Sequence, residues 1–143
     1  MQAKQLSVFI ENREGRLDEV LAVIKSVNVN ILSLSLADTS EYGLLRLIVS
    51  DPAAADAALK ENGFSSMLTS VLVVRLDNKV GSLQDFLALL AKANINLEYM
   101  YGLTIEKGGK ASLVIKASDL DIAADVLKNA GADLLSDEEI AKL

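Results

Sequence analysis

The stretch Asn12-Arg13-Glu14-Gly15-Arg16-Leu17 decides the fold of this 143-residue chain, because the chain contains it twice. It returns 66 residues later as Asn78-Lys79-Val80-Gly81-Ser82-Leu83, and Asn28-Val29-Asn30-Ile31 returns at the same spacing as Asn94-Ile95-Asn96-Leu97. A repeat of this length is too long for a solenoid unit and suits a small domain. The sequence therefore predicts two copies of one module, with domain boundaries at 1–69 and 70–143.

The composition narrows the classes of function. The chain has no Cys and no His, which excludes a thiolate nucleophile, His-based triads and zinc sites of the ordinary ligand type. We therefore expect no metal and no cofactor. The net charge is −6 and no basic stripe is visible, which argues against a nucleic-acid partner. The start has no signal-peptide core and no apolar run approaches the roughly 20 residues of a membrane span, so we expect a cytoplasmic protein without a membrane partner.

Hydrophobic periodicity predicts the elements of both copies. Leu17, Val20, Leu21 and Ile24 have helical spacing, and alternation of apolar residues marks strands. Asn28 stands where the first helix should end, because Asn tolerates the left-handed conformation of many helix C-termini. The predicted strands are 6–11, 32–36, 44–49 and 65–69 in the first copy and 71–76, 97–105 and 111–116 in the second. The predicted helices begin near 17, 52 and 83, and a fourth carries Ile122 to Leu127 and ends at Gly131. Turns are predicted at 38–43 and 107–109, and a capping box predicts a short helix over 138–143.

Each copy thus has the order β-α-β-β-α-β. The predicted fold class is α+β, with two tandem ferredoxin-like units, each an antiparallel four-stranded sheet with two helices on one face. The opposite sheet face also carries apolar residues, which we expect to pack against the sister unit or a second subunit. Only 64–70 separates the two copies and no flexible linker is visible, so we expect the last strand of the first copy to run into the first strand of the second.

A βαββαβ unit of this length, with a Gly-x-Leu turn before its first helix and an Asn-x-Asn element before its second strand, resembles an ACT domain. The resemblance covers essentially the whole chain as two tandem domains. It implies a regulatory module that binds an amino acid at the interface of paired domains, through the loop after the first strand and the start of the second strand. It also implies a homodimer formed through sheet or helix faces, and an enzyme of amino-acid metabolism as a possible partner.

The residues at those positions have suitable chemistry. Glycine lets backbone approach a ligand closely, the N–H groups that open a helix favour a carboxylate, and Asn side chains can pair with both ends of a zwitterion. The predicted ligand-binding residues fall in matching places of the two copies. They are Asn12, Glu14, Gly15, Arg16, Leu17, Asn30 and Ile31 in the first copy, and Asn78, Val80, Gly81, Ser82, Leu83, Asn96 and Leu97 in the second.

Simpler interpretations of the same residues stay open. Gly15 and Gly81 can be present only to make a turn, and Asn30 and Asn96 can satisfy local backbone groups. The leucines at 17 and 83 are expected in the core whatever the function. Since the turn Glu14-Gly15-Arg16 is more charged than Val80-Gly81-Ser82, two different sites, or one site and one degenerate copy, are both possible.

Three functions follow from these observations, in order of preference. The first is a non-enzymatic sensor or regulatory protein that binds a free amino acid or a close analogue. The alternative is a structural dimerisation or docking module with vestigial ligand sites. A small enzyme ranks lower, because no constellation of catalytic residues is recognisable.

Overall fold

The structure, a computed structural model, describes residues 2–38, 41–106 and 109–143. By its contacts the chain divides into two units. The first unit contains Lys4–Thr69 and Ala141–Leu143, and the second contains Ser70–Ile140 together with Gln2 and Ala3. The domain boundaries at 1–69 and 70–143 stay a prediction. The two units differ from them at both ends of the chain, where each end is grouped with the other unit. Residues 39–40 and 107–108 of the predicted turns lie outside the described residues.

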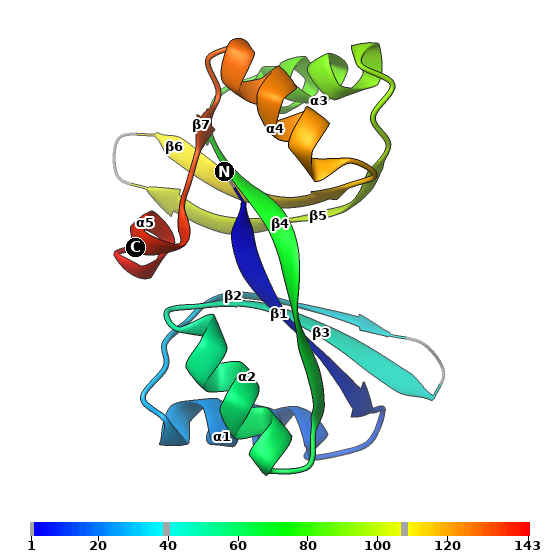
Figure 1. Cartoon of the computed structure of the whole chain (residues 1–143), viewed down its shortest axis with the longest axis vertical. Coiled ribbons are helices and arrows are strands. Elements are labelled where there is room, and N and C mark those ends of the chain that lie inside the picture. Colours follow the sequence, from blue (N-terminus) through cyan, green and yellow to red (C-terminus); the bar gives the residue numbers. More distant parts are fainter. Residues whose placement is uncertain (1, 39–40, 107–108) are drawn as a thin grey trace. The chain divides into compact units, whose positions relative to one another are not determined.

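The first unit has the predicted order of elements. They are β1 (Ala3–Glu11), α1 (Arg16–Ser26), β2 (Ile31–Asp38), β3 (Tyr42–Val49), α2 (Pro52–Glu61) and the first residues of β4 (Ser65–Asp77). β3 pairs antiparallel with both β1 and β2, and the strand order is β2-β3-β1-β4. Both helices lie on one face of this sheet (Figure 1).

The second unit repeats this plan. Its elements are the last residues of β4, then α3 (Ser82–Lys92), β5 (Leu97–Glu106), β6 (Lys110–Ala117), α4 (Leu120–Asn129), the two-residue β7 (Asp133–Leu134) and α5 (Asp137–Ala141). β6 pairs antiparallel with β4 and β5, and β7 pairs with β4. The fold class is therefore confirmed: α+β, with two tandem ferredoxin-like units. β4 is one continuous strand of 13 residues, as the absence of a linker predicts.

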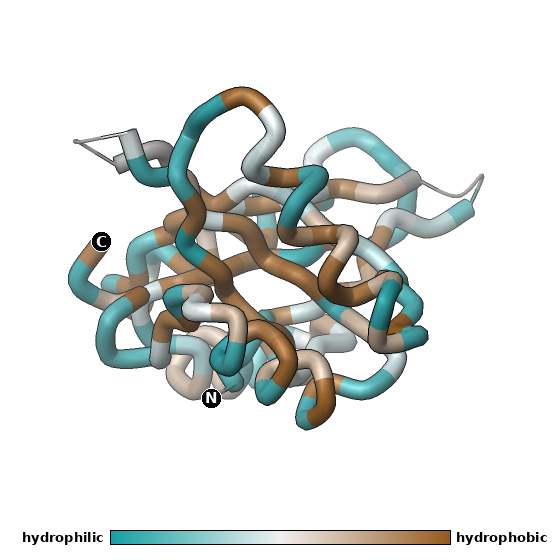
Figure 2. Tube along the Cα trace, turned by 90° about the horizontal axis from the view of Figure 1, so that it is seen from above, coloured by the Kyte–Doolittle hydropathy of each residue, from teal (hydrophilic) through white to brown (hydrophobic). Residues whose placement is uncertain are grey.

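Each unit buries its own core between the helices and one face of the sheet. Leu6, Val8 and Ile10 of β1 and Leu45, Leu47 and Val49 of β3 cluster with α1 and α2 residues such as Ile24 and Leu59. In the second unit Leu72, Val74 and Ile115 cluster with Phe86, Leu90 and Leu127. Leu113, predicted to belong to this core, is only half-buried. Figure 2 shows hydrophobic runs through the middle of the trace and a mixture of hydrophilic and hydrophobic residues in the outer turns.

The apolar residues predicted for the opposite sheet face are covered to different degrees. Ile48, Val73 and Val114 are at most 1% exposed. Phe9 remains 50% exposed.

All four long helices end in the same backbone turn. In α1, the N–H of Asn28 donates to Lys25 O (3.0 Å) and that of Val29 donates to Ile24 O (3.4 Å), which is the Schellman arrangement. The turn needs a residue with positive φ, and the four that supply it are Asn28 (58°), Gly63 (80°), Asn94 (57°) and Gly131 (82°). The predicted role of Asn28 and Asn94 as helix-terminating residues is thus confirmed.

The residue after each of these turns enters the space next to the core. These residues are Val29, Phe64, Ile95 and Ala132, of which the first three are 8% exposed. At the other helix ends, Asp51 and Asp119 cap α2 and α4 by accepting hydrogen bonds from Ala54 N and Ile122 N. The predicted capping box is also present, since Glu139 N donates to Ser136 Oγ and Ser136 N donates to Glu139 Oε2.

The expectation that Leu83 is a core residue is wrong, because 43% of it is exposed. Its counterpart Leu17 packs against the first core and faces the same pocket as Leu36. By strand register the position of Leu36, opposite Leu45, corresponds to Gly102, opposite Leu113. Glycine has no side chain to cover Leu83.

We predict that Asn28→Ala lowers the free energy of unfolding by about 1 kcal/mol, since the polar side chain of Asn offsets the cost of the left-handed conformation by local hydrogen bonding and Ala cannot. Asn28→Gly should cost nothing or stabilise the protein. Urea unfolding measures both. Asn129→Ala, at the exposed last residue of α4, is the control and should change the value by less than about 0.5 kcal/mol. Equal losses at both positions would contradict this account of the turn.

Candidate functional site

The repeated turn opens α1 and α3 in the same way. Gly15 and Gly81 have φ of 82° and 87°, and their carbonyls accept the N–H of Glu19 (3.0 Å) and Asp85 (2.9 Å). A Cβ added to either glycine would meet nothing within 4 Å. The glycines are therefore required for the left-handed backbone rather than for space, and this is enough to explain their recurrence.

A pocket of about 180 Å³ adjoins the turn of the first unit. We call it the first-unit pocket; the end of β1, the turn, α1 and the β2–β3 strands contribute to it. It is lined by Ile10, Glu11, Asn12, Arg13, Leu17, Leu36 and Gly43. Of the predicted site residues, the structure brings Asn12 and Leu17 together here.

Gly43 keeps this pocket open. A Cβ at Gly43 would lie 3.2 Å from Ile10 Cγ1 and 3.2 Å from Leu36 Cδ1. The register explains the proximity, because Gly43 stands opposite Ile10 on β1. Ile10, Leu36 and Gly43 were not predicted as site residues from the sequence, since only strand pairing places them beside the turn. Glu11 and Arg13, which flank Asn12 in the chain, also line the pocket and were not predicted either.

The two charged side chains that line the pocket, Glu11 and Arg13, form an ion pair. Arg13 Nε lies 2.9 Å from Glu11 Oε2, and both side chains are more than half exposed. Such a pair contributes little to stability, so both groups can turn toward a ligand at small cost. The lining thus offers a cation, an anion, the Asn12 amide and an apolar wall.

Arg16 serves the fold instead of this pocket. Its guanidinium carbon lies 4.6 Å from the centre of the Phe64 ring, and Nη1 lies 2.5 Å from Glu19 Oε2. Its Nε is buried without a hydrogen-bond partner among the described residues. Glu14, another predicted site residue, is exposed and does not line the pocket.

The backbone of each Asn-x-Asn element is held by two hydrogen bonds to a serine, one of them to the serine hydroxyl. Asn30 N donates to Ser50 Oγ (2.9 Å) and Ser50 N donates to Asn30 O (2.9 Å). Asn96 and Ser118 repeat the arrangement at 3.1 and 2.9 Å. Asn30 and Ile31 line a different hollow, at the end of α1. The repeated Ser-Asp pairs, 50–51 and 118–119, were the sequence signal for this connection.

The turn of the second unit carries a different set of charges. Asn78 N donates to Gly109 O (2.6 Å), and Val80 is fully exposed. Lys110 Nζ lies 2.5 Å from Asp77 Oδ1, and Lys79 Nζ is 3.9 Å from Asp77 Oδ2. The hydrogen bond from Lys110 lowers the pKa of the Asp77 carboxyl. Leu97, predicted for the site, packs against the second core.

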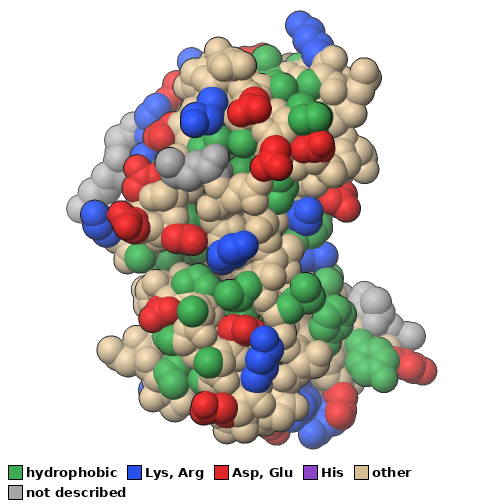
Figure 3. Space-filling view, viewed as in Figure 1, with side chains coloured by type: hydrophobic (Ala, Val, Ile, Leu, Met, Phe, Trp, Pro, Cys, Tyr) green, Lys and Arg blue, Asp and Glu red, His purple; other side chains and the backbone are tan. Residues whose placement is uncertain are grey.

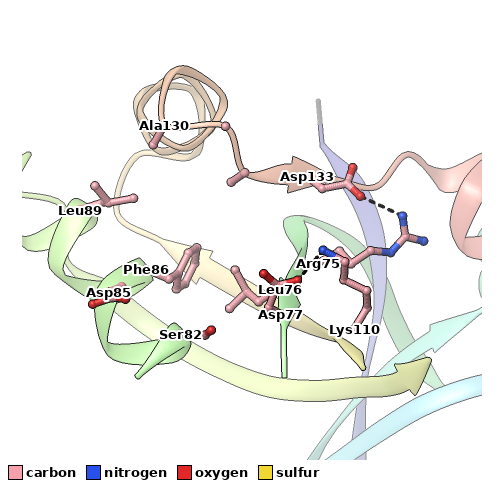
Figure 4. A pocket seen from close by; sticks show the side chains of 12 residues that line it. Arg75, Leu76, Asp77, Ser82, Asp85, Phe86, Leu89, Lys110, Ala130 and Asp133 are labelled. Atoms are coloured by element: carbon pink, nitrogen blue, oxygen red, sulfur yellow. Dashed lines mark hydrogen bonds and ion pairs between the residues drawn. The ribbon is translucent and has the colours of Figure 1, made fainter. Parts of the chain in front are cut away.

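A larger cavity of about 410 Å³ lies in the second unit, between α3, the end of β4 and the segment after α4. We call it the second-unit cavity. Figure 4 shows Ser82, Asp85, Phe86 and Leu89 on α3, Ala130 at the end of α4, and Asp133 directed toward Arg75. The ion pair between Arg75 Nη1 and Asp133 Oδ2 (2.8 Å) closes one side. Of the residues predicted for the second copy, Ser82 lines this cavity.

Over the described residues, no group of three or more Asp or Glu side chains is placed to hold a metal ion. Within the same ranges, none of the helices has the length and apolar character needed to cross a membrane. Acidic and basic side chains are interspersed on the face that Figure 3 shows.

The fold and the doubled turn define a tandem pair of ferredoxin-like modules. The family model described as an ACT domain pair matches residues 1–143, and the chain therefore belongs to this family.

Among solved structures, the chain is similar to protein BT0572 from Bacteroides thetaiotaomicron, with 40% identity, a TM-score of 0.94 and coverage of 100% of this chain and 98% of that one. It also shares its fold with the regulatory subunits of aspartate kinase from Thermus flavus (16% identity, TM-score 0.61, coverage 87% and 88%) and Thermus thermophilus (14%, 0.59, 89% and 91%). No curated protein matches the chain.

We predict that Lys110→Ala raises the pKa of Asp77 toward its ordinary value of about 3.9, because the variant removes the hydrogen bond that lowers it. A carboxyl with a depressed pKa stabilises the fold above its unfolded pKa and loses that contribution as the pH falls through its folded pKa. An NMR titration of the side-chain carboxyl carbons measures the shift.

Lys60→Ala is the matched control for this titration. Lys60 donates a hydrogen bond to Asp56 in the first unit (2.9 Å). Burial raises the pKa of Asp56, but hydrogen bonds from Lys60 and Ser66 outweigh it and lower the pKa overall. The control should therefore move Asp56 and leave Asp77 unchanged; movement of Asp77 in the control would contradict the assignment.

Proposed function

We propose that this protein is a regulatory, non-enzymatic protein of the cytoplasm that binds a free amino acid or a close analogue in the first-unit pocket. The observation that carries the proposal is the lining of that pocket, which combines Glu11, Arg13 and Asn12 with the apolar Ile10, Leu17 and Leu36. A zwitterion with a small apolar side chain needs this combination.

The charged groups assign the orientation of the ligand. Arg13 is a cation that pairs with a carboxylate, and Glu11 accepts hydrogen bonds from an ammonium group. The ligand's side chain would then lie against Leu17 and Leu36. The pocket volume of about 180 Å³ is below the range of about 300–1,000 Å³ typical of drug-sized ligands, which favours a small molecule.

A regulatory role is expected because binding of a ligand can shift an equilibrium between two states of the protein. A ligand shifts a conformational or association equilibrium only by binding one state better than another. Leu36 both lines the pocket and lies on β2, the edge strand of its sheet. A partner that covers β2 would close the pocket, so binding of ligand and partner would favour each other. The shared fold with aspartate kinase regulatory subunits supports an enzyme of amino-acid metabolism as that partner.

We propose different roles for the two repeated turns. The first, with Asn12 and Leu17, contributes to the ligand site. The second, Asn78 to Leu83, retains the left-handed glycine, but Gly102 replaces the apolar wall that Leu36 provides. The second turn is thus the poorer site for the same ligand.

We predict that Gly43→Ala abolishes amino-acid binding, because the added Cβ fills the pocket against Ile10 and Leu36. A thermal-shift screen of the amino acids provides the measurement. The wild-type ligand, at a hundredfold excess over Kd, should stabilise the protein by about 2.7 kcal/mol, and the variant should show no stabilisation.

Gly102→Ala is the matched control, since a Cβ there meets nothing within 4 Å. It should keep the full response to the ligand. If no amino acid stabilises the wild type at millimolar concentration, the proposal is wrong. A response that survives in Gly43→Ala would place the ligand elsewhere in the chain.

A second candidate function is a dimerisation or docking module with vestigial ligand sites. The observation that favours it is the apolar character of the edge strand β2, where Leu34 is 44% and Leu36 is 48% exposed. Exposed apolar edge strands are ready templates for association. A homodimer formed through this edge is the simplest case.

We predict that Leu34→Lys converts the dimer to a monomer, because an edge lysine opposes strand association. Sedimentation velocity measures the change. Ile122→Lys, at a 49% exposed apolar residue of α4, is the control and should leave the dimer intact. A wild-type monomer at all concentrations, or a dimer that survives Leu34→Lys, would rule out this edge as the interface.

A further inference from the structure

We propose that the second-unit cavity is a binding site for a small ligand with a cationic group on an apolar or aromatic body. The proposal does not depend on the amino-acid site, because the cavity belongs to the other unit and its lining does not include Asn12, Arg13 or Leu17. It rests on a comparison of the two copies of the repeat.

The positions that line the cavity are filled by large side chains in the first unit. Ser82, the first residue of α3, stands 66 residues after Arg16, the first residue of α1. Ala132 follows the turn that ends α4, as Phe64 follows the turn that ends α2, and both donate N–H to the helix carbonyl five residues back. An Arg and a Phe in one copy are thus replaced by a Ser and an Ala in the other.

Arg16 and Phe64 show what this space accepts. The Arg16 guanidinium lies over the Phe64 ring at 4.6 Å and forms an ion pair with Glu19 at 2.5 Å. These side chains join the start of α1 to the end of α2. In the second unit the same two elements, α3 and the segment after α4, are separated by the cavity of about 410 Å³.

The second unit retains a carboxylate at the position of Glu19, which pairs with Arg16 in the first unit. Asp85 stands 66 residues after Glu19, in the first turn of α3, and lines the cavity. The other charged side chains of the lining already form pairs, Arg75 with Asp133 and Lys110 with Asp77. For the Asp85 carboxylate, no hydrogen bond or ion pair is found with any residue that the structure describes.

The rest of the lining suits an apolar body. Phe86 is 3% exposed and forms a floor with Leu76 and Leu89, and Ser82 adds a hydroxyl beside Asp85. The volume falls within the range of small-molecule sites, about 300–1,000 Å³. A ligand that places its ring near Ala132 and its cation near Asp85 would reproduce the contacts of Arg16 and Phe64.

The test uses phenylguanidine as a probe and phenylurea as its neutral isostere, with the full-length protein in isothermal titration calorimetry. Phenylguanidine should bind the wild type and phenylurea should bind more weakly. The double variant Ser82→Arg/Ala132→Phe, which installs the side chains of the first unit, should lose binding of both probes. If both probes bind equally well, or if neither gives heat at millimolar concentration, the proposal is wrong.

A single substitution keeps the test valid if the double variant does not fold. Asp85→Asn should lower the affinity for phenylguanidine about tenfold, the effect of one charge-assisted hydrogen bond, and leave the affinity for phenylurea unchanged. Asp125→Asn makes the same change of charge at an exposed residue of α4 outside the cavity. It should change the affinity for neither probe. Equal weakening in both Asp variants would show a general effect of charge and would overturn the site.

Phenylguanidine binding also distinguishes the second-unit cavity from the first-unit pocket of the proposed function. Gly43→Ala, which closes the first-unit pocket, should not change phenylguanidine binding. Conversely, the Ser82→Arg/Ala132→Phe variant should keep its response to amino acids. A phenylguanidine signal that disappears in Gly43→Ala would assign the probe to the first-unit pocket and refute the second-unit site.

Discussion

The left-handed turn at the end of each long helix is the constraint on which both units depend. Each turn reverses the chain and directs the next residue toward the space between helix and sheet. The conformation is costly for most residues with a Cβ, but Gly has none and the polar side chain of Asn offsets the cost, so the turn is occupied by Asn28, Gly63, Asn94 and Gly131. The residue that follows then decides whether the space beyond is filled. Phe64 is buried there and supports Arg16, whereas Ala132 leaves a cavity.

The two copies thus share one backbone plan, but their side chains leave pockets in different places. The first unit is filled between α1 and α2 but keeps a small pocket beside its turn, which Gly43 holds open. The second unit has Gly102 where the first has Leu36, and it is open between α3 and the segment after α4. A duplicated module can acquire different ligand sites in this way, because a few side-chain exchanges at fixed backbone positions move the cavity.

Much of the fold could be predicted because its signals are local. Periodic apolar residues, Asp51 before Pro52, and Asn at the end of a helix each act within a few positions of the chain. The residues beside the glycine turn were harder to predict. Arg16 lies in the repeated stretch yet stacks on Phe64, while Gly43 and Leu36 line the pocket from strands that pair far along the sequence. Leu83 has the pattern of a core residue, but its exposure depends on Gly102.

The sequence by itself determined the duplication, the βαββαβ order, the helix ends and the exclusion of cysteine and histidine chemistry, since each of these is recorded in residue identity and local spacing. Only the tertiary structure decided which side chains meet. Strand register set Gly43 against Ile10, and the packing of helix ends set Arg16 on Phe64 and left Ser82 and Ala132 apart. The physical reason is that a pocket is the volume that neighbouring side chains fail to fill, and those neighbours come from elements distant in sequence.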